Sequence, residues 1–214
     1  MKKRSIFTLV LSLSLTAVIG IGSTLAYLTA QTATRVNTFT VGKVNMTLTE
    51  PNWDAASSHI LVPGVPIDKD PTITVEQNSE DAYVFVKAVY PTGLENYYNS
   101  GSLFGVDPSD WKIVYSSTLD STNSVAIAQY IGQGAYVPKN TAGDTAITIF
   151  TQVGLNSEVT TAQASSIAAL NPSLTLTSYA IQKAAVDSAA LAGQLSSLSN
   201  VTIAANQLDM ASAS

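Results

Sequence analysis

Short runs in which apolar and polar residues alternate recur along this chain, and they limit the fold it can adopt. Between residues 44 and 49, Val44, Met46 and Leu48 alternate with Asn45, Thr47 and Thr49. Side chains of a β-strand point alternately to its two faces, so this run predicts a half-buried strand. Gly42, just before it, suggests a bulge or bend.

A second run predicts a strand in the middle of a sheet. Residues 72–75 and 82–88 indicate two strands around a polar turn, Glu76 to Asp81, which we interpret as a hairpin. The second strand is largely apolar on both faces, because Tyr83, Phe85 and Lys87 alternate with Val84, Val86 and Ala88. Both faces are therefore expected to be buried.

Further strands and two helices follow. Residues 111–117 predict a strand with Trp111, Ile113 and Tyr115 on one face, and strand patterns return at 124–132, 135–155 and 173–186. Residues 157–170 predict a helix capped by Asn156 or Ser157, with Val159, Gln163, Ile167 and Leu170 along one stripe. Residues 187–200 predict a short helix capped by Asp187, with Leu191, Leu195 and Leu198 at helical spacing. The chain is therefore expected to be mainly β, an antiparallel β-sandwich with short helices appended in the C-terminal half.

Composition narrows the function classes. The 214 residues are 46% hydrophobic and only 12% charged, with a net charge of -5, which is typical of a β-rich exported protein and not of a disordered chain. An acidic chain without a basic patch is a poor candidate for binding nucleic acid. There is no cysteine and one histidine, His59. Thiolate chemistry and sites with several histidines are therefore unavailable.

The first 26 residues have the three parts of a signal peptide: the basic start MKKRS, an apolar stretch, and the small residues Thr24 and Ala26. We predict cleavage between Ala26 and Tyr27. An uncleaved membrane anchor is the alternative, since the apolar run is near the lower limit for a membrane span. The predicted organisation is a signal peptide at 1–26, an N-terminal extension at 27–36 and a β-sandwich domain at 37–214.

Four blocks of the sequence resemble the TasA/camelysin family of secreted bacterial proteins, which depend on a SipW-type signal peptidase. They are GSTLAYLTAQTATRVNTFTVGKVNMTLTE, LVPGVPIDKDPTITVEQNSEDAYVFVKAV, DWKIVYSS and LTLTSYAIQKAAVDSAALA. The second departs from the family pattern, because Glu76-Gln77-Asn78-Ser79 replaces the usual Asn-x-Gly turn. Residues 94–170 match only through DWKIVYSS.

The resemblance implies a jelly-roll-like sandwich that is exported to the cell surface or extracellular matrix and polymerises into biofilm fibres. In such families the new N-terminus of one subunit completes the sheet of the next. The partners implied are further copies of the chain, the SipW-type peptidase and, as an option, an accessory matrix or anchor protein. The donor strand would be Tyr27, Leu28, Thr29, Ala30, Gln31, Thr32, Ala33, Thr34 and Arg35.

Strand donation also has a physical basis. A sandwich that lacks a strand exposes unpaired backbone groups and an apolar groove, and an extended segment of another subunit can fill both. The segment 27–35 contains no proline or glycine and one charged side chain. The alternatives are a frayed terminus or an edge strand within the same molecule.

Catalytic and metal-binding roles find little support in the sequence. His59 would need ligands converging from elsewhere, and an exposed loop histidine is the simpler interpretation. A loose acidic cluster of Asp68, Asp70, Glu76, Glu80 and Asp81 offers oxygen ligands suited to calcium, but its spacing fits no EF-hand loop, and a solvated acidic edge is favoured. No nucleophile motif or cofactor fingerprint is present. We expect a non-enzymatic protein without cofactor, the alternatives being a camelysin-like cell-surface metallopeptidase and a non-polymerising adhesin or fibre anchor.

Overall fold

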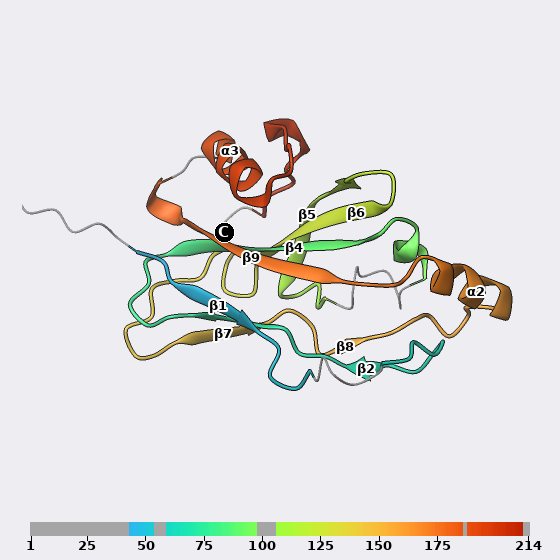
Figure 1. Cartoon of the computed structure of the whole chain (residues 1–214). Coiled ribbons are helices and arrows are strands. Elements are labelled where there is room, and N and C mark those ends of the chain that lie inside the picture. The colour runs from blue at the N-terminus through green and yellow to red at the C-terminus, as the bar shows by residue number, and fades with distance from the viewer. Residues whose placement is uncertain (1–42, 54–58, 98–105, 186–187, 212–214) are drawn as a thin grey trace, which may run out of the picture. The chain divides into compact units, whose positions relative to one another are not determined.

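The structure, a computed structural model, describes residues 43–53, 59–97, 106–185 and 188–211. It is mainly β with antiparallel pairing, and the two α-helices within these ranges, α2 (Thr161–Ala169) and α3 (Ser188–Ser199), fall in the C-terminal half (Figure 1). The expected fold class is therefore confirmed. The finer jelly-roll arrangement stays a prediction, since the two main sheets have three and four strands.

The first sheet has the order β1 (Met46–Thr49), β3 (Thr72–Val75), β7 (Thr145–Thr148). Met46 lies opposite Val75, and Thr72 opposite Thr148. Met46 and Leu48 are partly buried while Thr47 and Thr49 are exposed, as the alternation in the sequence predicts. This sheet therefore turns its apolar face to the core.

The second sheet has the order β5 (Trp111–Thr118), β6 (Asn123–Tyr130), β4 (Ala82–Pro91), β9 (Thr175–Gln182). β4 is an inner strand with apolar side chains on both faces. Val84 and Val86 face the first sheet, whereas Phe85 packs with Leu191 and Leu195 of α3. The prediction of a central strand is confirmed.

The sequence interpretation of residues 72–88 as a hairpin is wrong. β3 and β4 belong to different sheets, so the turn between them carries the chain from one layer to the other. The physical reason is the second apolar face of β4, which needs cover on both sides. The first sheet covers one face and α3 covers the other.

The strand β5 contains a bulge that the sequence pattern did not reveal. Its register against β6 shifts between Ile113 and Tyr115, which leaves Val114 as an extra residue. Trp111 and Ile113 therefore join the core between the sheets, while Val114 and Tyr115 both pack on the α3 side. The expectation that Tyr115 shares a face with Trp111 is wrong for this reason.

Both helices differ in detail from the sequence expectation. Thr160 caps α2, not Asn156 or Ser157: its hydroxyl accepts from the backbone N–H of Gln163, and the Gln163 side chain accepts from Thr160 N–H in return. Gln163 is thus a capping residue and not part of the apolar stripe. Within that stripe, Ile167 is buried. In α3, Leu191 and Leu195 are buried, but Leu198 is 48% exposed.

Smaller elements complete the fold. β2 (Ile67–Asp68) pairs with β8 (Gln152–Val153), and 3₁₀ turns span Leu94–Asn96, Lys183–Ala185 and Ala205–Gln207. The bonds from Ile149 N–H to Pro71 O and from Lys69 N–H to Thr151 O connect the β2–β8 pair to the β3–β7 pair. Lys69 therefore lies at the junction of the two pairs.

Several predictions concern residues outside the described ranges. These are the signal peptide 1–26, the cleavage site Ala26–Tyr27, the donor segment Tyr27 to Arg35, the bend at Gly42 and the capping role of Asp187. They stay predictions.

Candidate functional site

The turn that follows β1 is hydrogen-bonded to the junction between β2 and β3. Trp53 N–H donates to Glu50 O at 3.2 Å, which closes a four-residue turn with a proline in its second position. Asp70 accepts from the Asn52 backbone N–H at 3.0 Å and from the Asn52 side-chain amide at 2.7 Å. This turn therefore has a defined position relative to Lys69 and Asp70.

Lys69 makes electrostatic contacts with two residues of the same turn. Its Nζ lies 2.8 Å from Glu50 Oε1 and 3.9 Å from the ring centroid of Trp53. The Lys69 side chain is only 9% exposed, and a buried ammonium is tolerated where a carboxylate and an aromatic face replace water. Lys69 thus holds Glu50 and Trp53 in place.

Trp53 has a close neighbour on each face. The imidazole of His59 stacks on it at 3.8 Å between ring centroids, with the planes 19° apart. Lys69 Nζ must lie on the opposite face, because on the same face the two groups would overlap. His59, Trp53, Lys69 and Glu50 form a continuous wall, which we call the Lys69 wall.

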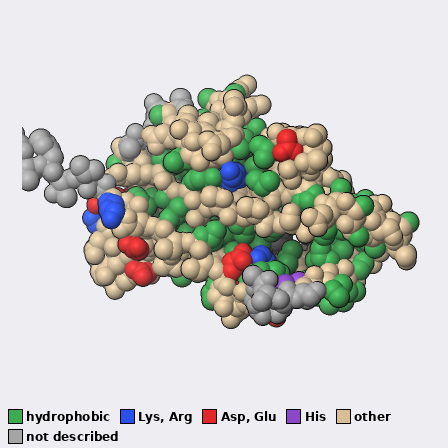
Figure 2. All heavy atoms as spheres, viewed as in Figure 1, with side chains coloured by type: hydrophobic (Ala, Val, Ile, Leu, Met, Phe, Trp, Pro, Cys, Tyr) green, Lys and Arg blue, Asp and Glu red, His purple; other side chains and the backbone are tan. Residues whose placement is uncertain are grey.

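The Lys69 wall borders a hollow of about 710 Å³, which we call the Lys69 hollow. The other lining is mostly apolar: Ile67 of β2, Val153 of β8, Leu155, and Ala164, Ile167 and Ala168 of α2. The lining is completed by Ile60 and Leu61 and by the residues that lead into β9, Pro172, Ser173 and Leu174. Figure 2 shows hydrophobic side chains around a hollow on this face, with acidic and basic groups beside it. A volume between about 300 and 1,000 Å³ with a few convergent polar groups is typical of a ligand pocket.

Glu50 is the acidic group in the lining of the hollow. Within the described ranges, Glu50 Oε2 has no protein hydrogen-bond donor, since the ion pair with Lys69 uses Oε1. Glu50 is partly exposed, with 31% of its side chain accessible. The site can therefore accept a cationic or N–H donor group against an apolar background.

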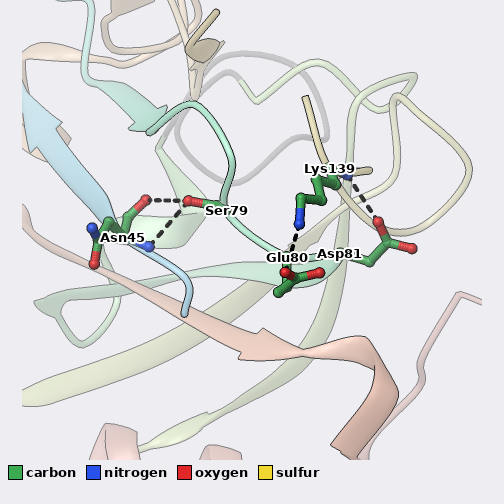
Figure 3. Close-up of polar contacts among 5 residues, drawn as sticks. All are labelled: Asn45, Ser79, Glu80, Asp81 and Lys139. Carbon is green, nitrogen blue, oxygen red and sulfur yellow. Dashed lines mark hydrogen bonds and ion pairs between the residues drawn. The ribbon is translucent and has the colours of Figure 1, made fainter. Parts of the chain in front are cut away.

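The carboxylates of the predicted acidic cluster do not converge on one site, because each makes its own local contacts. Glu80 pairs with Lys139 at 2.7 Å, and Asp81 accepts from the Lys139 backbone N–H at 2.8 Å (Figure 3). Glu76 accepts from the side chain of Asn45. The other two carboxylates also accept hydrogen bonds, Asp68 from Gln152 and Asp70 from Asn52. These carboxylates thus stabilise the turns around β1 and β3.

The segment entering β1 is fixed by the same turn region. Asn45 N–H donates to Ser79 Oγ at 3.2 Å, and that hydroxyl donates back to Asn45 O at 3.3 Å (Figure 3). Glu80 N–H donates to Lys43 O. The chain is therefore anchored from Lys43 onward, directly after the undescribed N-terminal residues.

The two sheets meet at two long sides, and one of them is open. β1 lies beside β9, and each is the last strand of its sheet, so we call this pair the open side (Figure 1). On β9, Lys183 N–H donates to Asp81 O, which sets the alternation of the ladder with β4. The N–H and C=O groups of Leu176, Ser178, Ala180 and Gln182 therefore point away from β4, and no described strand pairs with them.

The other long side, formed by β5 and β7, is covered; we call it the closed side. The indole N–H of Trp111 donates to Thr148 O at 3.1 Å, which joins the two strands. Asp209 N–H donates to Val114 O at 2.9 Å, so the C-terminal segment covers part of the β5 edge.

Sequence reasoning located few of these groups. It singled out His59 only as an exposed loop residue; the structure agrees that it is exposed but stacks it on Trp53. It did not identify Glu50, Trp53 or Lys69, because their contact joins segments that no local pattern relates. The proline-containing turn at Glu50 to Trp53 was the one available signal.

Within the described parts of the chain, no group of three or more His, Cys, Asp or Glu residues is placed to hold a metal ion. In the same residues no helix has the length and apolar character needed to cross a bilayer. Comparison with protein-family models, curated proteins and solved structures found no match. The fold defines the chain as a mainly β protein with two packed antiparallel sheets and a helix on the outer face of one.

Proposed function

We propose that this chain is an exported structural subunit whose copies join into extracellular fibres of a bacterial biofilm matrix. After cleavage between Ala26 and Tyr27, the segment Tyr27 to Arg35 of one copy adds as a strand to the open side of the next. The proposal rests on the residues that resemble the TasA/camelysin family and on the unequal protection of the two sides of the sandwich.

The observation that carries the proposal is the outer edge of β9. This strand has eight residues, TLTSYAIQ, without charge, proline, glycine or bulge, and its register with β4 is continuous. An edge strand of that kind is a ready template for another chain, and proteins usually protect it. Main-chain bonds along such an edge would supply affinity, and alternate side chains would set the register.

The neighbouring strand β1 supports the same conclusion. Its core-facing side chains, Met46 and Leu48, are only partly buried, whereas Ile73 of the adjacent inner strand β3 is 0% exposed. An added strand on this side would cover apolar surface as well as backbone groups.

The donor segment has the properties such an edge requires. Its nine residues match the eight of β9 in length, and only Arg35 is charged. Donation from one copy to the next is head-to-tail and leaves a new open side at the far end, so it propagates into a filament.

The proposal is tested by comparing the chain Tyr27–Ser214 with a shortened chain Asn37–Ser214 by electron microscopy. Fibres are expected from the first and only monomers from the second, with circular dichroism showing that both keep the same β content. Equal fibres from both chains would exclude Tyr27 to Arg35 as donor. Monomers from both, in all conditions, would favour a non-polymerising adhesin.

A further inference from the structure

We infer that the Lys69 hollow binds a small amphipathic cation, a molecule with an apolar body and one ammonium group. The ammonium group binds Glu50, and the apolar body packs against the apolar lining. This site goes beyond the proposed function, because strand donation at the open side does not require it. Binding is non-covalent and involves no transfer of a group or of electrons.

The size and lining of the hollow fit a small ligand. Its volume of about 710 Å³ lies within the range of small-molecule sites, roughly 300–1,000 Å³. The helix α2 contributes Ala164, Ile167 and Ala168, which share one face of the helix, and the two short alanine side chains fill little of the space. Ile60 also lines the hollow and is 74% exposed, so the apolar surface continues to the rim. Exposed apolar surface that continues into a hollow is typical of a binding site.

Contacts within the protein already fix the polar wall of the hollow. The turn that carries Glu50 and Trp53 is hydrogen-bonded to Asp70. Lys69 lies against one face of Trp53 and His59 stacks on the other, so this ring has no face left for stacking on a ligand. Recognition therefore depends on charge and on apolar contact. A site fixed in this way loses little free energy to ordering when a ligand binds.

Charge complementarity favours a cation over an anion. Glu50 Oε1 pairs with Lys69, and Oε2 has no protein donor among the described residues, so an ammonium group can form a charge-assisted hydrogen bond there. The Lys69 side chain is 9% exposed, against 31% for Glu50, and its charge already faces that carboxylate and the Trp53 ring. Asp68 and Asp70 flank Lys69 in the chain, whose net charge is -5. Both features attract cations and repel anions.

The experiment titrates freshly isolated monomer of the chain Tyr27–Ser214 with octylamine, octan-1-ol and octanoate. These probes share an alkyl chain and carry a positive, a neutral and a negative head group near neutral pH. Tryptophan fluorescence measures binding, because Trp53 lines the hollow while the other tryptophan, Trp111, is buried on the closed side. Octylamine is expected to bind saturably and at least about tenfold more tightly than octan-1-ol, with octanoate weakest, since only the ammonium group gains the bond to Glu50.

A shorter amine tests the apolar lining with the same head group. Hexylamine is expected to bind about tenfold more weakly than octylamine, because it buries two fewer methylene groups. Equal affinities of the two amines would show that the alkyl chain stays outside the hollow, and would overturn the inference.

A pair of substitutions on α2 tests whether the hollow is the site. Ala168 and Ala169 are both exposed on α2, but only Ala168 is part of the described lining. Ala168→Phe is expected to occupy part of the hollow and to weaken octylamine binding at least about tenfold. Ala169→Phe is expected to change it by less than about twofold. Phenylalanine adds no tryptophan signal, and thermal unfolding verifies that both variants keep the fold.

A second pair of substitutions tests the head group. Glu50→Gln keeps the size of the side chain but removes its charge, so octylamine and octan-1-ol are expected to bind within about threefold of each other. Asp68→Asn removes the same charge from β2, outside the described lining, and should leave a preference of at least about tenfold for the amine. Because Glu50→Gln also removes the carboxylate partner of Lys69, thermal unfolding of this variant is measured. The substitutions on α2 leave that ion pair unchanged and test the site independently.

The remaining outcomes decide the inference without reference to fibres. Absence of saturable octylamine binding would overturn it, and so would equal affinity for the three head groups. Equal effects of Ala168→Phe and Ala169→Phe would show that the amine binds elsewhere. Fibre growth enters none of these measurements, so the fibre proposal stands or fails separately.

Discussion

The open and closed sides of the sandwich have the same basic construction but different protection. Each consists of the last strand of one sheet beside the last strand of the other: β1 with β9, and β7 with β5. The edge of β5 is interrupted by the bulge at Val114, carries Lys112 and is partly covered by the segment around Asp209. The edge of β9 has none of these features within the described residues.

The difference shows that edge protection in this chain is local and not a general property of its composition. Bulges, charged side chains and covering segments are the usual means by which proteins prevent unwanted strand pairing. All three occur at β5. None of the described residues provides them at β9, and this is the basis for proposing that β9 receives a partner strand.

The largest effect on stability is expected at the contact that joins β5 and β7 on the closed side. Trp111 is 2% exposed, packs edge-on against Tyr130 at 5.5 Å and donates to Thr148 O. Trp111→Ala should lower the free energy of unfolding by about 3–5 kcal/mol, through lost burial and a cavity. Urea unfolding measures this loss.

A matched control separates the hydrogen bond from the packing at this position. Trp111→Phe keeps an aromatic ring but leaves Thr148 O without the indole donor, so a loss of about 1–3 kcal/mol is expected. If Trp111→Ala costs less than about 1 kcal/mol, the closed side does not depend on this contact.

The second-largest effect on stability is expected when the segment that covers β5 is removed. A chain ending at Gln207 lacks the Asp209 N–H that binds Val114 O and the Ala211 N–H that binds Gln129 Oε1 at 3.0 Å. Gln129 is 0% exposed, so its oxygen loses its partner at a cost of about 1–3 kcal/mol. Because the β5 edge becomes uncovered, self-association is also expected to increase.

Urea unfolding and analytical ultracentrifugation measure the two results. The control is Asp209→Ala, which removes only the exposed ion pair with Lys112 and should cost less than about 1 kcal/mol. A shortened chain as stable and as monomeric as the parent would show that the segment does not protect the edge.

Proline substitutions can test the open side, because alternate backbone N–H groups of β9 point towards β4 and away from it. Ser178 N–H points away from β4, whereas Thr177 N–H belongs to the β4 ladder. Ser178→Pro is expected to change unfolding free energy by less than about 1 kcal/mol while preventing fibre growth, since proline is tolerated at a free edge but offers no donor there. Electron microscopy and urea unfolding verify these results.

Thr177→Pro is the control, expected to destabilise the fold because it removes a ladder bond inside the sheet. If both substitutions destabilise equally, the outer edge of β9 is occupied within the molecule. The alternative of an edge strand contributed by the same chain would then be favoured over donation.

The fold could be predicted from the sequence to the extent that it depends on local alternation. The faces of β1 and β4 follow directly from the order of apolar residues. The bulge at Val114 could not be predicted, since it depends on the register with β6. The crossing between β3 and β4 was misread as a hairpin, because a polar turn between two strands does not specify which sheet the second strand joins.

The candidate site was even less predictable. The Lys69 wall combines the turn after β1, His59, and the junction of β2 and β3, and no periodicity relates these segments. The asymmetry between the two sides likewise depends on tertiary contacts such as that of Trp111 with Thr148. Only the absence of charge in residues 175–182 was visible in the sequence.

The smallest effect is expected at the hairpin that connects β5 to β6 on the closed side. Asp120 Oδ1 accepts from the backbone N–H groups of Thr122 and Asn123, both at 2.8 Å. These bonds, that from Thr122 first, lower the pKa of Asp120 to about 2. Since the folded pKa lies below the unfolded value of about 4, the stabilisation is complete above about pH 4 and is lost as the pH falls towards 2. Asp120→Ala should therefore be less stable than the parent at pH 6, with a difference that shrinks between pH 4 and pH 2 in urea unfolding. A difference that stays constant over that range would mean that the carboxylate charge does not contribute, and that the hairpin fixes the β5 register through its backbone alone.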